Sequence, residues 1–140
     1  MEISTKLRYG ARALAELGCA YPDRTVPARE LAEAQCLSIK YLEHILSSLK
    51  TAGIVRAVRG MNGGYRLNRA PEEITLKTVF LALEGPPAPV KCTNNPDSCD
   101  QIATCPTYPT WVELQNAIVK VLESTTIADL SARLEKKRNN

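Results

Sequence analysis

Three cysteines lie within one short stretch, at the spacing Cys92-x6-Cys99-x5-Cys105. The stretch otherwise holds little apolar material, so hydrophobic packing cannot by itself fix its shape. Thiolates are the ligands of iron–sulfur clusters and of soft metal ions. The spacing therefore favours a segment shaped by an inorganic group, with Cys92, Cys99 and Cys105 as its metal ligands.

The same thiols allow three other interpretations. Three thiolates and a fourth ligand would also suit Zn²⁺. A metal-free thiol switch would work through a sulfenic acid or a disulfide, and a structural loop would carry the thiols incidentally. The chain has five cysteines, an odd number that excludes full disulfide pairing within a monomer. The remaining two, Cys19 and Cys36, lie near apolar helix faces and are expected to be small buried residues.

Charge is distributed unevenly along the 140 residues, whose net charge is +3. Residues 1–70 carry eleven Lys and Arg against six Asp and Glu, whereas residues 71–140 carry seven against nine. A basic front half favours a polyanionic partner such as nucleic acid. No apolar run approaches the ~20 residues of a membrane span, and residues 1–20 do not read as a signal peptide. We therefore expect a cytoplasmic protein without a membrane partner.

Hydrophobic periodicity predicts mostly helices and one hairpin. Helices are expected over residues 4–20, from Pro27 to about residue 36, and over 39–50, where the inner stripe is Ile39, Leu42, Ile45, Leu46 and Leu49. Two short strands around Asn62-Gly63-Gly64 form a hairpin. Further helices begin at Thr75, at a Thr110–Glu113 capping box and at Thr126, and the chain ends in a frayed tail from Lys136.

This order predicts a mainly α fold with a small β-hairpin: a winged helix-turn-helix followed by a long C-terminal dimerisation helix. Residues 1–84 form the DNA-binding domain, 85–109 the cysteine-containing cluster-binding loop, and 110–140 the dimerisation helix and a last helix. The apolar stripe of the long helix has two interpretations, since it could cover the core or form a dimer. An enzyme is not expected, because the chain has a single histidine and no phosphate-binding glycine loop.

The third helix is the candidate recognition helix, because a helix fits the major groove and its N-terminal residues reach base edges. Glu43 is informative, since a carboxylate weakens phosphate binding unless it accepts a hydrogen bond from a cytosine amine. An arginine in the wing can enter a narrow minor groove. The candidate DNA-binding residues are Ser38, Lys40, Tyr41, Glu43, His44 and Arg59.

The run from Leu42 to Leu67, with Ser4–Gly10 and Thr126–Leu130, resembles the Rrf2 family of winged-helix transcription regulators, in the IscR-like group with NsrR and CymR. The resemblance covers residues 1 to about 134. It implies a homodimer in which the long helices of the two subunits cross. This dimer binds a double-stranded DNA operator of dyad symmetry. Lys40 and His44 stand where IscR-like members carry smaller or neutral polar residues, so the operator sequence stays open.

The resemblance also implies that the three cysteines hold an iron–sulfur cluster, [2Fe–2S] in preference to [4Fe–4S]. At the position of the family's ligating histidine this chain has Tyr108, and the aspartate used by some NsrR-like members falls on Arg8, so the fourth ligand stays open. The implied function is a cluster-sensing regulator, a repressor of genes for cluster biogenesis or sulfur metabolism. The alternative is a cluster-free, CymR-like regulator controlled by a protein partner or by thiol oxidation.

Overall fold

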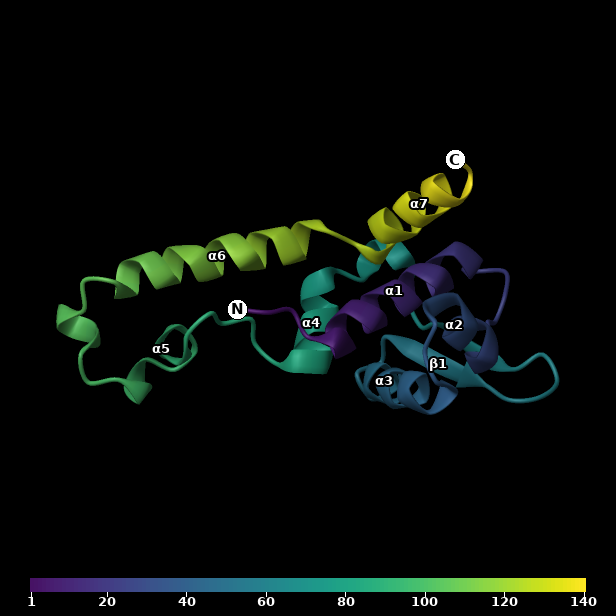
Figure 1. Ribbon diagram of the computed structural model, residues 1–140, viewed down its shortest axis with the longest axis horizontal. Coiled ribbons are helices and arrows are strands. Elements are labelled where there is room, and N and C mark those ends of the chain that lie inside the picture. The colour runs from purple at the N-terminus through teal and green to yellow at the C-terminus, as the bar shows by residue number, and fades with distance from the viewer.

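The computed structural model describes every residue from Met1 to Asn140. Helices α1 to α4 and α7 surround one core together with a two-stranded sheet, while α6 and the segment before it extend away from the core (Figure 1). None of the helices is both long enough and apolar enough to cross a membrane. The elements are α1 (Thr5–Ala20), α2 (Ala28–Gln35), α3 (Ile39–Thr51), β1 (Val55–Val58), β2 (Gly64–Leu67), η1 (Pro71–Glu73), α4 (Leu76–Glu84), α5 (Lys91–Asn94), η2 (Pro96–Ser98), η3 (Ile102–Thr104), α6 (Tyr108–Ser124) and α7 (Ile127–Arg138).

The core is built from aliphatic side chains, and seventeen buried residues form one continuous cluster. Leu14 of α1, Leu46 of α3 and Ile74 before α4 are fully excluded from solvent. Ile127, the first residue of α7, is also fully buried, so the chain returns to the first domain after α6. The last helix therefore shares its core with the helix-turn-helix and packs along α1.

Four helices begin with a side-chain cap. Ser4, Ser38, Thr75 and Thr126 each accept a hydrogen bond from the backbone N–H three residues ahead, at 3.0–3.2 Å. The Asp129 carboxylate in turn accepts from Thr126 N at 2.8 Å, which completes a capping box. Each cap satisfies a backbone donor that the first helical turn leaves free. The predicted starts of α1, α3, α4 and α7 are confirmed.

The hairpin is the wing, and it is fixed to the helices by an additional contact. Strands β1 and β2 are antiparallel, with Val55 opposite Leu67 and Val58 opposite Gly64. Tyr65 also exchanges two backbone hydrogen bonds with Val26, at 2.8 and 2.9 Å, so the segment between α1 and α2 pairs with the edge of the wing. A Cβ on Gly64 would lie 2.3 Å from Val26 O, so only glycine permits this approach.

Residues 86–124 form an arm that projects from the core (Figure 1). No residue between Ala88 and Thr126 is buried, and α5 lies against α6. Part of the apolar stripe of α6 stays open to solvent, since Trp111 is 36% exposed, Leu114 42% and Val121 63%. The stripe therefore does not cover the core of its own chain.

Three predictions about helix ends are wrong. Helix α6 begins at Tyr108 without a side-chain cap, because Pro109 suits a first turn, so the Thr110–Glu113 capping box does not form. Pro27 is the N-cap of α2, not its first helical residue. The tail is helical to Arg138, because that guanidinium pairs with Glu16 of α1 at 2.5 Å.

Candidate nucleic-acid interface and cysteine segment

The recognition helix α3 is positioned by its buried face. Leu42, Ile45, Leu46 and Leu49 are all fully buried, which fixes the rotation of the helix on the core. The turn from α2 passes through Cys36, whose φ of 55° is left-handed, and two carbonyls of α2 accept its N–H. This turn directs the N-terminus of α3 to the surface, as in a helix-turn-helix.

Three of the predicted DNA-binding residues, Lys40, Glu43 and His44, are exposed on the outer face of α3. Ser38 is exposed as well, although its Oγ also caps the helix. Tyr41 is only half-buried, because its ring packs edge-on against Tyr9 with the centroids 6.5 Å apart. Tyr41 thus belongs partly to the core, and its hydroxyl is the part suited to a phosphate contact.

The wing lies next to this face. Arg59 is exposed directly after β1, as predicted. Burial raises the pKa of the Tyr65 hydroxyl in β2, and the negative charge of Glu43 raises it further. Helix α3 also packs against β1, so the recognition helix and the wing adjoin each other.

Two exposed apolar residues on this surface were not predicted. Ile39 was assigned to the inner stripe of the third helix, but it is 39% exposed because it occupies the first helical position, right after the Ser38 cap. Met61, at the tip of the wing, is fully exposed. Apolar side chains can contact thymine methyl groups or wedge into the minor groove. In the sequence, Ile39 is offset from the Leu42–Leu49 stripe, and this offset could have indicated that it is exposed.

The three clustered cysteines lie at separate points of the arm. Cys92 is in α5, Cys99 follows η2 and Cys105 follows η3, and none of them is buried. The segment is held mostly by local hydrogen bonds, such as Thr93 Oγ1 to Val90 O at 2.8 Å and Asn95 N to Lys91 O at 2.9 Å. Local bonds without a buried side chain leave the segment's shape easy to change.

Cys105 differs from the other two in its hydrogen bonding. Its Sγ lies 3.3 Å from Thr107 Oγ1. The Thr107 hydroxyl and the backbone N–H groups of Thr107 and Tyr108 together lower the pKa of the Cys105 thiol. Donors that point at a sulfur stabilise its thiolate, which is the form that binds metals and reacts with oxidants.

The donors in the segment fit an iron–sulfur cluster in type, because thiolates hold such clusters. The fold of one chain does not gather them, however: no three His, Cys, Asp or Glu side chains lie close enough together to hold a metal ion. The segment would have to rearrange to bring Cys92, Cys99 and Cys105 onto one group.

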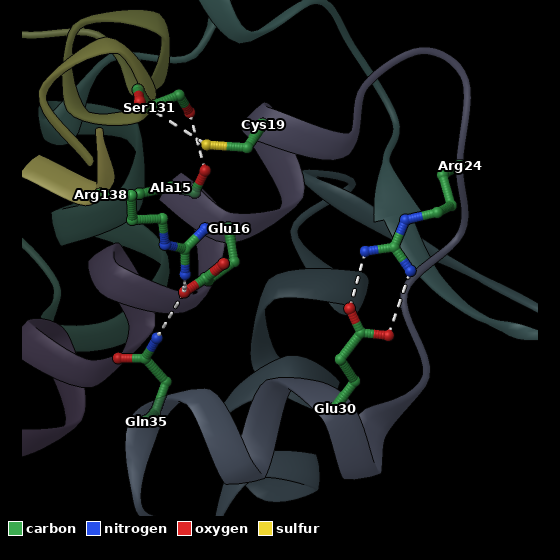
Figure 2. Close-up of polar contacts among 8 residues, drawn as sticks. All are labelled: Ala15, Glu16, Cys19, Arg24, Glu30, Gln35, Ser131 and Arg138. Atoms are coloured by element: carbon green, nitrogen blue, oxygen red, sulfur yellow. Dashed lines mark hydrogen bonds and ion pairs between the residues drawn. The ribbon is translucent and has the colours of Figure 1, made fainter. Parts of the chain in front are cut away.

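The two remaining cysteines were expected to be buried. Cys19 of α1 is half-buried, and its thiol donates a weak bond to Ser131 O at 3.6 Å (Figure 2). Burial raises the pKa of the Cys19 thiol, with a further rise from Glu135. Cys36 is exposed, so the expectation was wrong there, because the left-handed turn carries its side chain away from the core.

A helix-turn-helix with an adjoining hairpin and a basic, exposed second helix defines a winged-helix DNA-binding protein. The Rrf2 family profile, described as an iron-dependent transcriptional regulator, matches residues 3–133. Protein rrf2 of Nitratidesulfovibrio vulgaris Hildenborough is 35% identical over 130 residues, which cover 93% of this chain and 87% of that protein.

Two solved structures share the whole architecture. The structure of CymR, the global cysteine regulator of B. subtilis, has a TM-score of 0.82 and 34% identity, covering 95% of this chain and 98% of that one. The T. potens IscR structure has a TM-score of 0.80 and 33% identity, covering 98% and 90%. The chain belongs to the Rrf2 family of DNA-binding transcription regulators, and it is not an enzyme.

Proposed function

We propose that this regulator binds a dyad-symmetric operator as a homodimer and that an iron–sulfur cluster on Cys92, Cys99 and Cys105 sets its operator affinity. The main support is the arm itself, which presents three thiols on a segment without a single buried side chain. The family description as iron-dependent agrees with this proposal. The genes it represses would be those of cluster biogenesis or sulfur metabolism.

In this proposal the exposed face of α3 enters the major groove. Lys40 and His44 contact phosphates or base edges, and Glu43 accepts a hydrogen bond from a cytosine amine. Ser38 and Tyr41 donate to phosphates, which fixes the register of the helix without reading sequence. Arg59 enters the adjacent minor groove from the wing.

The exposed stripe of α6 supports the homodimer. Trp111, Leu114 and Val121 form an apolar line on a helix that projects from the core, and such a line is stable when it is covered. A second copy of the chain covers it with the same line, as a two-fold interface requires. The dimer then places two recognition helices on two half-sites of one operator.

The arm is connected to the DNA-binding domain by backbone bonds. Leu76 N, at the start of α4, donates to Thr125 O at 2.8 Å, and Ile127 N donates to Ile74 O at 2.8 Å. Lys77 of α4 pairs with Glu123 of α6 at 2.6 Å. A change in the cysteine segment would shift α6, and these bonds would carry the shift to the helices behind α3. The coupling requires that the two states of the segment differ in operator affinity.

A bound cluster would supply a redox-active and oxygen-sensitive centre at the outer end of the arm. The chain's own residues would supply three thiolates, and the donors around Cys105 lower the pKa of that thiol. [2Fe–2S] is favoured over [4Fe–4S] by the resemblance to IscR.

The second candidate is a cluster-free regulator controlled by thiol oxidation or by a protein partner, as proposed by analogy with CymR. Of these two modes of control, the lowered pKa of Cys105 favours thiol oxidation, because a thiolate reacts with peroxide faster than a thiol does. Cys105 is also only half-buried, directly after η3, so an oxidant can reach it.

Iron and sulfide content of the protein purified without oxygen separates the two candidates. The cluster hypothesis expects stoichiometric iron and sulfide, with a Mössbauer spectrum that identifies the cluster type. Replacement of Cys92, Cys99 or Cys105 by Ala should abolish iron binding and leave the fold intact by circular dichroism, because none of the three is buried. The control Cys36→Ala, also exposed, should retain iron. An iron-free wild-type protein, or variants that keep their iron, would refute the cluster assignment.

A further inference from the structure

Ile39 is the only apolar side chain among the exposed residues of α3, and 39% of it is open to solvent. Leu37 and Tyr41, two positions to either side, pack against the core, whereas Ile39 belongs neither to the core cluster nor to the residues packed on it. A role for this isoleucine therefore has to be sought on the outer surface of the helix. The other exposed residues of α3 are Lys40, Glu43, His44, Ser47, Lys50 and Thr51.

The rotation of α3 brings Ile39 and Glu43 onto the same flank of the helix. Four fully buried leucine and isoleucine side chains of α3 fix this rotation on the core. Residues four positions apart lie about 40° from each other around a helix and about 6 Å apart along it. Ile39 thus lies one turn before Glu43, at the N-terminal end of the helix, where the side chains of a recognition helix reach base edges.

The start of the helix holds the backbone of Ile39 in place. Ser38 Oγ accepts a hydrogen bond from Tyr41 N at 3.1 Å, and Ile39 follows this cap as the first helical residue. An isoleucine side chain is branched at Cβ, which leaves one strongly preferred χ1 rotamer in a helix. The side chain therefore loses little conformational entropy when a partner covers it.

Thymine is the base whose edge suits an isoleucine in the major groove. Its C5 methyl is the only apolar group that any of the four bases presents there, and the other groups are hydrogen-bond donors and acceptors. An isoleucine against such a polar group would remove water without replacing its hydrogen bonds, at a cost in free energy. Against the methyl group, apolar surface is buried on both partners. A phosphate is no partner for this side chain, because phosphates are bound by cationic and hydrogen-bonding groups.

We propose that Ile39 reads a thymine in each half-site of the operator by van der Waals contact with the C5 methyl group. This inference rests on the proposed function as an operator-binding regulator, and it adds a second base to the cytosine that Glu43 reads. Base pairs follow one another at about 3.4 Å along a DNA strand. The spacing of Ile39 and Glu43 along the helix therefore places the thymine about two base pairs from that cytosine.

The test exchanges thymine for uracil, which removes the methyl group and leaves every hydrogen-bonding atom of the base in place. The full-length protein, purified without oxygen, first selects a duplex from a pool of random-sequence DNA. Each thymine of the selected half-site is then replaced in turn by deoxyuridine, and affinity is measured by fluorescence anisotropy at one salt concentration. At one thymine position the exchange should weaken binding by about fourfold for each half-site that carries it.

Variants of Ile39 assign this loss to the side chain. Ile39→Ala should bind the thymine and uracil duplexes equally well at that position, whereas Ile39→Val keeps the branched Cβ and should retain part of the wild-type ratio. The ratio compares two duplexes with the same protein preparation, so a partial loss of folded protein does not change it. The matched control Leu81→Ala removes another exposed apolar side chain, on α4, and should keep the full ratio.

Two outcomes would overturn the role of Ile39 and leave operator binding intact. One is a selected duplex in which every thymine can be exchanged for uracil without loss of affinity. The other is an Ile39→Ala protein that keeps the wild-type ratio of thymine to uracil binding. A protein that selects no duplex from the pool would instead overturn the proposed operator binding, and the reading of thymine with it.

Discussion

Among single residues, Glu43 has the sharpest proposed role in operator reading. It is exposed on α3, and it lies close enough to the wing to raise the pKa of Tyr65. A carboxylate at a DNA surface repels every phosphate, so its presence is favourable only where it meets a base amine.

Glu43→Ala should therefore reduce discrimination against a mismatched operator by about 1–3 kcal/mol while total affinity changes less. The measurement is binding to the operator and to random duplex at equal salt concentration. The control Glu72→Ala removes an exposed carboxylate outside α3 and should leave the specificity ratio unchanged. A parallel fall in specific and non-specific binding would contradict a base-reading role.

Cys105 is the other residue whose surroundings predict a measurable property. Thr107→Val removes the hydroxyl that contributes most to the lowered pKa of Cys105. The thiolate loses a donor, so the pKa should rise toward the ordinary thiol value of about 8.5. Cys105 alkylation measured against pH, with peptide mass spectrometry as readout, should show a midpoint at higher pH in the variant. Below that midpoint the variant should react more slowly than the wild type.

Thr104→Val is the matched control, because the Thr104 hydroxyl donates to Gln101 O at 3.3 Å and does not contact Cys105. Its alkylation midpoint should equal that of the wild type. If both threonine variants shift the midpoint alike, the effect would come from the segment's conformation and not from the Thr107 hydrogen bond.

At the scale of the elements, the close contact between α1 and α7 attaches the chain to its core again after the arm. Gly18 permits this contact, because a Cβ there would lie 2.0 Å from Ser131 Oγ and 3.2 Å from Ile127 Cγ2. Ser131 is itself held, since its Oγ donates to Ala15 O at 2.8 Å. Figure 2 shows this bond beside the contact of Cys19 with Ser131.

Gly18→Ala should lower the free energy of unfolding by about 1–3 kcal/mol, because overpacking outweighs the gain in helix propensity. Denaturant unfolding monitored by circular dichroism measures the change. Ser131→Ala removes the clashing hydroxyl, so adding it to Gly18→Ala should recover part of the loss. A more stable Gly18→Ala protein would show that α1 and α7 pack less closely than described.

At the scale of the whole molecule, the projecting arm determines the proposed assembly. The core is complete within one chain, whereas α6 buries none of its residues. A helix whose apolar stripe is left partly uncovered in the monomer is what a dimer interface requires.

Leu114→Asp places a charge in the middle of the stripe and should convert the dimer to a monomer at micromolar concentration. Operator affinity should then fall by at least about tenfold, because two linked half-sites become two separate ones. Asn116→Asp makes the same change of charge on the opposite face of α6 and serves as the control. Sedimentation velocity gives the oligomeric state, and a Leu114→Asp protein that remains dimeric would place the interface elsewhere.

The sequence alone determined the order of elements, the winged helix-turn-helix and most helix starts, because periodicity and caps such as Ser38 and Thr126 are local properties. It also identified the cysteine segment, since thiols without apolar neighbours are visible in composition. Only the tertiary structure decided that Ile39 is exposed, that Tyr41 packs on Tyr9 and that Cys36 points outward. These outcomes depend on how α2 and α3 are rotated on the core.

The return of α7 to α1 and the pairing of Val26 with Tyr65 join residues far apart in the chain. No local pattern encodes such contacts, because each depends on surfaces that face each other only after folding. The same holds for the stripe of α6, whose periodicity is equally compatible with a core and with an interface. Its exposure was decided by the direction in which the arm leaves the core.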